Sequence, residues 1–328
     1  MKFIITFSLV FIGFFGNSQT FGLKKNPDLK FFQKADSLEQ SRFVPSATFS
    51  AISYTGFSVG LYHAWYKGFA QESFHLFDDR GEWNNMDKYG HFYTAYFQGL
   101  LVYKGAKWTG LSEDKSILTG FLLGTLFQST IEVMDGFSSN WGFSLADVGM
   151  NFAGSGAFVA QQKFWGEQRI YFKMSNVIGG YPDQIIQSTD GNATTTLLSR
   201  ANNLYGDNFA ERFLKDYNNQ VYWASIDVKK FAPNSSFPKW LNVAVGYSAG
   251  NLYGGFENRW EENGFTFDVS DLYPRHSRFL IAPDINLSSI RTNSYFWNGV
   301  LDVFDIFHLP LPALEINTLG EVHFHFFQ

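Results

Sequence analysis

The sequence contains no cysteine among its 328 residues. This absence excludes disulfide bonds, a thiolate metal site, a cysteine nucleophile and a lipid carried on an N-terminal cysteine. Charged residues are also scarce, since they make up 17% of the chain where about a quarter is usual. The net charge is −5 and the chain has no basic run, so we expect no nucleic-acid partner.

Aromatic residues are abundant instead, with 38 Phe, 16 Tyr and 9 Trp. Hydrophobic residues reach 45% of the chain. Large aromatic groups favour boundaries between apolar and aqueous surroundings, which indicates a membrane or a very apolar core. Membrane lipid or other envelope components are therefore the expected partners, and the oligomeric state stays open.

The first nineteen residues have the features of a secretory signal peptide. Lys2 supplies the positive region, Phe3–Phe15 the apolar stretch, and "GNS" the small residues before a cleavage point near Gln19. An uncleaved anchor is the alternative, but the apolar run is shorter than the roughly 20 residues needed to span a bilayer. We expect residues 1–19 to be removed on export.

Four uncharged or nearly uncharged stretches follow a polar segment, residues 20–45, which is expected to hold a brief surface helix ending near Pro45. Their apolar residues occur all round and are interrupted by Gly, Ser and Ala, which predicts helices buried in protein or embedded in a membrane. We expect one bundle over residues 46–164, with helices at 46–66, 86–103, 116–134 and 144–160.

Small residues recur four positions apart in this region, as in Gly120 with Gly124 and Gly149 with Ala153. This spacing allows close helix contact in lipid, but small residues equally fill a tight soluble bundle. The lysine-rich loop at 104–115 would lie outside in a four-span inner-membrane protein, against the positive-inside rule. We therefore favour the periplasm or the outer membrane.

From residue 165 the pattern changes to β-branched and aromatic segments separated by turns rich in Asn, Gly and Pro. Two short helices are expected between them, at 208–217 and 296–307, and a hairpin turn at 318–320. The fold class is thus α+β, with an irregular antiparallel β-rich region over 165–328. Five expected strands are fewer than the eight of the smallest membrane barrel. The strands are expected at 168–175, 221–231, 240–250, 278–287 and 313–327.

Polar residues inside the apolar helices are few, and their spacing would let them converge at one end of the bundle. Three pairs each lie three or four residues apart, hence on one helix face. Lys88 lies about 100° round the helix and would neutralise part of the acid excess. The pairs are Asp87 with His91, Glu132 with Asp135, and Asp147 with Asn151.

Two chemistries suit such a cluster. One is a divalent metal held by His91 with Asp87, Glu132 or Asp135, and no other cofactor is expected. The other is acid–base catalysis by the same four residues, with pKa values split by burial and proximity. Lys88, Asp147, Asn151 and Ser144 would complete a binding cluster.

Each residue also has a structural explanation. Asp87 suits the positive end of a helix dipole, and Ser144 with Asp147 has the spacing of a capping box. His323 and His325 share a strand face, but an exposed strand end explains them better than a metal. "GYSAG" at 246–250 lacks the following helix that a nucleophile elbow needs. We favour a structural polar cluster over a catalytic one.

Several segments resemble a known family. "EWNNMDKYGHFYTAY", "IEVMDGFSSNWGFSLADVGMNFAGS", "EQRIYFK" and "WLNVAVGYSAG" are similar to the YfiM-like family of uncharacterised exported envelope proteins. The helical part is more distantly similar to VanZ-like membrane proteins, which share an Asp-Lys-x-x-His-Phe start and an Asp-x-x-x-Asn-x-x-Gly helix. The resemblance implies an exported envelope protein and no established reaction. The alternative is an enzyme acting on a lipid or cell-wall substrate at the same cluster.

Overall fold

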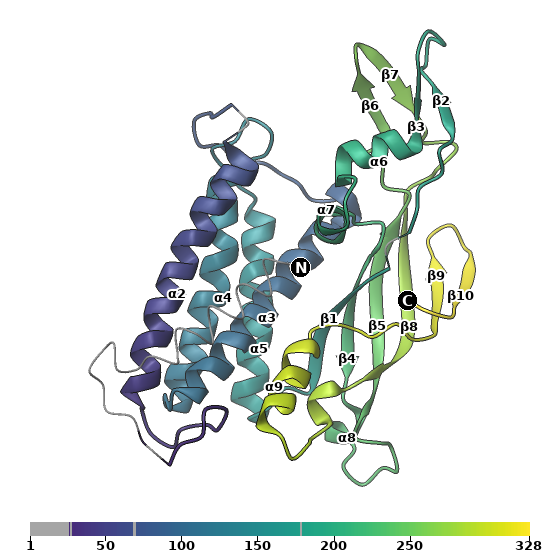
Figure 1. Ribbon diagram of the computed structural model, residues 1–328. Coiled ribbons are helices and arrows are strands. Elements are labelled where there is room, and N and C mark those ends of the chain that lie inside the picture. Colours follow the sequence, from purple (N-terminus) through teal and green to yellow (C-terminus); the bar gives the residue numbers. More distant parts are fainter. Residues whose placement is uncertain (1–25, 27, 68–69, 178) are drawn as a thin grey trace. The chain divides into compact units, whose positions relative to one another are not determined.

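A computed structural model describes residues 26, 28–67, 70–177 and 179–328 of the chain (Figure 1). The predicted signal peptide, residues 1–19, lies outside the described residues. Helices come first and an antiparallel sheet follows, so the α+β class expected from the sequence is confirmed.

All four predicted helices are present, each a few residues longer than expected. They are α2 (Gln40–Leu61), α3 (Met86–Trp108), α4 (Glu113–Asp135) and α5 (Leu145–Trp165), and a π-helical turn, η2 (Tyr62–Tyr66), continues α2.

The first of these helices differs from the prediction at its start. α2 begins at Gln40 and runs through Pro45, where the sequence predicted a helix end. Proline has no N–H, so it leaves only the carbonyl of Ser41 without a helical donor. One lost bond close to the helix start does not stop a helix of this length.

The six-stranded sheet has the order β1-β4-β5-β8-β9-β10, with every neighbouring pair antiparallel. Each of the five predicted strand segments occurs in it, and the last one forms two strands joined at Gly320, whose φ is +84°. The strands are β1 (Ile170–Asn176), β4 (Gln220–Ile226), β5 (Leu241–Gly250), β8 (His276–Ile285), β9 (Ala313–Asn317) and β10 (Val322–His325).

Two small two-stranded sheets were not expected, because each of their strands is only three or four residues long. β2 (Ile185–Gln187) pairs with β3 (Thr194–Thr196), and β6 (Arg259–Glu262) pairs with β7 (Phe265–Asp268). The apolar side chains that pack together here are Ile186, Leu197, Tyr253, Trp260, Phe267 and Val269.

Short helices connect the strands. The predicted helices at 208–217 and 296–307 correspond to α7 (Phe209–Lys215) and α9 (Tyr295–Phe304). The remaining short helices and turns are η3 (Glu82–Asn85), α6 (Leu197–Tyr205), α8 (Val228–Phe231) and η4 (Leu287–Ser289).

The chain divides into two compact units. Among the described residues, the helical unit comprises those before residue 80, those at 94–168 and those at 292–299, and the β-rich unit comprises those at 80–93, 169–291 and 300–328. The boundary falls inside α3, so the first two turns of that helix belong to the β-rich unit.

The buried side of α4 is polar and small. Five of its seven buried positions follow a spacing of four residues, while three leucines on the other side are exposed to more than 40%. A Cβ on Gly120 would lie 2.5 Å from the carbonyl oxygen of Gly99, so glycine permits the close approach of α3 and α4. The buried positions are Ser116, Ile117, Gly120, Gly124, Thr125, Gln128 and Glu132, and the exposed apolar ones include Leu118, Leu122 and Leu126.

Candidate functional site

The segment that leads into α3 is a strained left-handed turn. Trp83, Asn84 and Asn85 have φ values of 49°, 51° and 63°. This conformation costs an L-residue roughly 1–2 kcal/mol, and asparagine tolerates it better than most residues. Three successive residues in this region require strong fixation by their surroundings.

The fixation comes from the β-rich unit. The guanidinium of Arg275 donates to the side-chain oxygen of Asn84 at 3.2 and 3.3 Å, and the hydroxyl of Tyr247 donates to the Asn84 carbonyl at 2.5 Å. The amide of Trp83 donates to the carbonyl of Gly255 at 2.6 Å. These bonds determine where α3 begins.

Asp87 lies in the first turn of α3, where it has three polar neighbours. The hydroxyl of Tyr217 donates to Asp87 Oδ1 at 2.9 Å, and Lys88 Nζ lies 3.3 Å from Oδ2. His91 Nε2, one helical turn on, lies 3.8 Å from Oδ1. Burial raises the pKa of Tyr217 and the Asp87 charge raises it further, so Tyr217 stays a hydrogen-bond donor.

In the helical unit, Ser144 connects two acids at the start of α5. Its hydroxyl donates to Asp79 Oδ1 at 2.7 Å, and its amide donates to Glu132 Oε2 at 3.3 Å. The same hydroxyl oxygen accepts the amide of Asp147 at 3.0 Å, which is the expected N-cap. All four side chains are buried.

Asp135 and Asn151 are the two remaining predicted residues of the helical unit. Asp135 accepts a 2.7 Å hydrogen bond from the hydroxyl of Tyr66, the last residue of η2. Asn151 is fully buried, one helical turn beyond Asp147 on α5.

Asp87 and His91 offer two potential metal ligands one helical turn apart on α3. A carboxylate oxygen of Asp87 and the Nε2 of His91 lie 3.8 Å apart. An imidazole nitrogen with a carboxylate suits zinc, manganese or iron in the divalent state. Glu132, Asp135 and Asp147, also considered for this cluster from the sequence, belong to the helical unit, whereas Asp87 and His91 belong to the β-rich unit.

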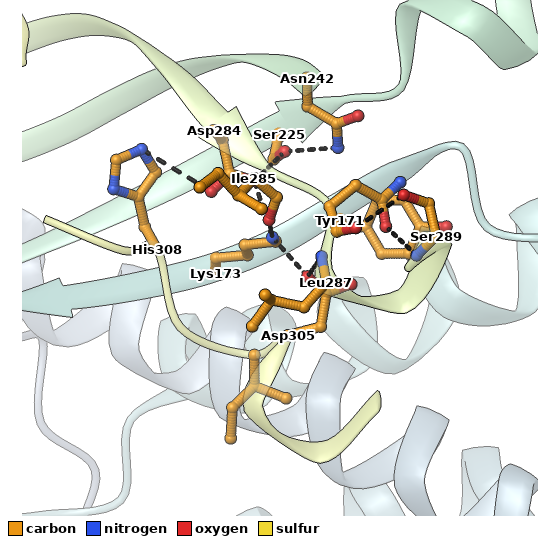
Figure 2. A network of polar contacts seen from close by, with 12 residues as sticks. Tyr171, Lys173, Ser225, Asn242, Asp284, Ile285, Leu287, Ser289, Asp305 and His308 are labelled. Carbon is orange, nitrogen blue, oxygen red and sulfur yellow. Dashed lines mark hydrogen bonds and ion pairs between the residues drawn. The ribbon is translucent and has the colours of Figure 1, made fainter. Parts of the chain in front are cut away.

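A second polar centre lies inside the six-stranded sheet, around Lys173 of β1 (Figure 2). Its ammonium group is completely buried and lies 2.7 Å from a carboxylate oxygen of both Asp284 and Asp305. It donates its third hydrogen to the carbonyl of Ile285 at 3.0 Å. The hydroxyl of Ser225 donates to the same oxygen of Asp284 at 2.6 Å.

His308 borders this centre. Its ring stacks on Trp223 with ring centroids 4.1 Å apart, and its Nε2 lies 3.2 Å from the carbonyl of Pro283. Burial lowers the pKa of His308, and the nearby Asp284 carboxylate offsets only part of that effect. The neutral ring is therefore the favoured form at neutral pH.

Sequence reasoning missed both Asp79 and the Lys173 centre. Asp79 stands in a polar connector, where an acid is unremarkable. Lys173, Asp284 and Asp305 are far apart in the chain and come from two strands and the end of α9. A usable signal was the alternation Tyr171, Lys173, Ser175, which places three polar groups on one face of β1.

Residues 75–163 match the model of a family described as "Predicted periplasmic lipoprotein (DUF2279)". The matched region contains α3, α4 and all but the last two residues of α5, and with them Asp79 and all eight predicted cluster residues. No curated protein and no solved structure matches the chain.

The match supports an uncharacterised exported envelope protein and confirms the predicted location, periplasmic or outer-membrane-associated. The lipid in the family's description does not carry over to these 328 residues, because they include no cysteine to bear it.

Proposed function

We propose that this protein is a non-enzymatic component of the cell envelope whose helical unit is embedded in a membrane, with its buried polar cluster fixing the packing of the helices. The polarity of α4 carries this proposal. Apart from Ile117, its buried side is lined by serine, threonine, glycine, glutamine and glutamate, and Leu118, Leu122 and Leu126 line its exposed side. A helix at a water-facing surface would have the opposite arrangement.

Other observations support the embedding. Within the described residues, α4 has the length and composition to cross a membrane. Exposed apolar side chains also occur on α2 and α5, for example Ile52, Val59, Leu145 and Phe152. In lipid the hydrophobic effect does not drive helices together, so close packing through small residues and interhelical hydrogen bonds must stabilise their association. Gln128 donating to Gln98 at 3.3 Å is one such bond.

The cluster around Ser144 suits a packing role. Buried carboxylates are costly unless hydrogen-bonded, and Ser144 supplies a donor to both Asp79 and Glu132. Ser144 thereby links the connector before α3, the end of α4 and the start of α5. Hydrogen bonds that join three segments at one serine fix the positions of these segments relative to one another. This packing role requires no chemical reaction.

The embedding is tested with Leu122→Lys on the exposed side of α4. A lysine at the centre of a membrane helix costs about 2.5–3.5 kcal/mol on insertion, whereas the same change on a water-facing helix costs almost nothing. We expect the unmodified chain to resist alkaline carbonate extraction from membranes and the variant to be released or lost. Asn234→Lys, in an exposed loop of the β-rich unit, is the matched control. Release of the unmodified chain by salt or osmotic shock would refute the embedding.

A second candidate function is a metal-assisted or acid–base reaction on a lipid or cell-wall substrate. The position of Asp87 and His91 one turn apart on α3, with a carboxylate oxygen and an imidazole nitrogen 3.8 Å from each other, favours it. In such a reaction His91 would be the ligand or proton carrier, and Tyr217 would hold Asp87 in place through its hydrogen bond.

Metal analysis separates the two functions. We expect, under the second candidate, about one equivalent of divalent metal per chain, lost in His91→Ala and in Asp87→Asn. His323→Ala, at an exposed position of β10, is the control and should retain the metal. If the unmodified chain contains no metal and His91→Ala has no phenotype, the second candidate function is rejected and the packing role remains. The YfiM-like and VanZ-like resemblances stay predictions under either function.

A further inference from the structure

The outer side of the six-stranded sheet carries a row of apolar side chains. Val245, Ile281, Leu314 and Phe324 are direct cross-strand partners on β5, β8, β9 and β10. Each is exposed to more than 40%, and Phe324 to 59%. The row is continuous across four strands and contains no charge.

A second row runs beside the first. Phe279, Ile316 and Val322 are cross-strand partners on β8, β9 and β10, and all three are more than half exposed. Tyr247 continues this row on β5, where it packs on Tyr89 of α3 with ring centroids 4.4 Å apart. The exposed part of both rows, which we call the outer face, therefore lies mainly on β8, β9 and β10.

The covered side of the same strands combines an apolar cluster, which includes Leu280, Ala282 and Ala313, with buried polar groups. On β9, Glu315 and Asn317 are buried while Leu314 and Ile316 between them are exposed. On β8, Asp284 is completely buried against Lys173 (Figure 2). A sheet with one face in water turns polar side chains outward on that face, whereas a sheet next to lipid turns its apolar side chains outward.

The chemistry of the outer face indicates which surface it contacts. A protein interface contains a hydrogen bond for about every 100–200 Å², together with a polar rim. The side chains of the two exposed rows offer no donor or acceptor on β8, β9 and β10. Acyl chains require none.

We propose that the outer face of β8, β9 and β10 contacts the acyl chains at a membrane surface. β10 is an edge strand in the described sheet, and its main-chain groups need water, so the sheet lies at the interface and does not cross the bilayer. Exposed phenylalanines suit that depth. This inference does not depend on the proposed insertion of the helical unit, since it rests on other residues.

The absence of cysteine allows a direct test by site-directed spin labelling. Ile281→Cys and Ile316→Cys place a label on the outer face. Glu261→Cys, an exposed strand position on β6, is the matched control, and Leu122→Cys reports on α4. The full chain is reconstituted into vesicles of phosphatidylethanolamine and phosphatidylglycerol, and collisions with oxygen and with a water-soluble nickel complex are measured.

We expect oxygen collisions to dominate at the two outer-face positions and nickel collisions to dominate at Glu261→Cys. Nickel collisions dominating at Ile281→Cys and Ile316→Cys would overturn the inference, as would spin–spin broadening that places a second copy on this face. Leu122→Cys separates the two proposals. If oxygen collisions dominate at Leu122→Cys while nickel collisions dominate at the outer face, only the present inference is rejected. A water signal at Leu122→Cys with lipid at the outer face rejects only the insertion of α4. A chain that does not bind the vesicles rejects both.

Discussion

α4 of the helical unit and β9 of the β-rich unit have the same distribution of polar and apolar side chains, but the buried polar groups are of different kinds. Both bury polar side chains and expose apolar ones. Along α4 the buried groups are mostly small or uncharged, and Glu132 comes only at the end. Inside the sheet the buried polar groups include ions, with Lys173 between Asp284 and Asp305, beside an apolar cluster.

The difference shows two ways of tolerating polar groups inside a protein with an apolar surface. The helical unit satisfies its main-chain groups within each helix and keeps its acids close to serine and tyrosine donors. The sheet brings opposite charges together, which is stable only while every member is present. We therefore expect the sheet to be more sensitive to single substitutions than the bundle.

The largest effect is expected for Lys173→Met. The variant leaves Asp284 and Asp305 buried without their ammonium partner, which costs about 3–5 kcal/mol of unfolding free energy. Urea unfolding followed by tryptophan fluorescence measures the loss. Lys215→Met removes a half-exposed pair with Glu211 and serves as the control, with a loss of about 1 kcal/mol or less. Equal losses in the two variants would show that the Lys173 centre does not hold the sheet together.

An intermediate effect is expected for Gly120→Val. The new side chain meets the carbonyl of Gly99, and overpacking of this kind costs about 1–3 kcal/mol. Thermal unfolding in detergent, followed by helical circular dichroism, measures the change. Gly149→Val is the matched control, because nothing lies within 4 Å of a Cβ at that position. If the control is destabilised as much, helix propensity and not close packing explains the result.

A smaller, pH-dependent effect is expected from His308. Burial lowers the pKa of its ring in the folded protein, so the folded state disfavours the proton relative to the unfolded chain. The stability contribution is complete above the unfolded value of about 6.5 and is lost as the pH falls through the folded-state pKa. Lys173 and Asp284 are the charged groups that act on the ring.

The measurement is the unfolding free energy at about pH 8 and about pH 5 for the unmodified chain and for His308→Gln. The unmodified chain should lose more stability on acidification than the variant. His323→Gln, with its exposed ring, should follow the unmodified chain. An identical loss in His308→Gln would assign the acid sensitivity to other groups.

The sequence predicted the elements well, because their signals are local. Four uncharged stretches gave α2 to α5, and alternation gave all the strands of the six-stranded sheet. The turn at Gly320 followed from glycine's tolerance of positive φ. The start of α2 was missed since the penalty of Pro45 is small near a helix end.

The site was less predictable, because its partners come from distant segments. The spacing of Asp87 and His91 on one helix face was readable, and so was the cap made by Ser144 with Asp147. The donation of Tyr217 to Asp87 joins residues 130 positions apart, and no periodicity reports such a contact. The polar interior of the sheet was missed for the same reason.

The left-handed turn before α3 has a consequence for how the chain tolerates length changes. Arg275 and Tyr247 hold Asn84 in place through hydrogen bonds, so the first turn of α3 has a fixed orientation about the helix axis. Each residue added between Asn84 and Asp87 would rotate the rest of the helix by about 100°. One insertion would turn Asp87 and His91 away from Tyr217 while leaving the composition of the helix intact. This turn therefore sets the orientation of α3 about its own axis. The number of residues between positions 84 and 87 is as constrained as their identity.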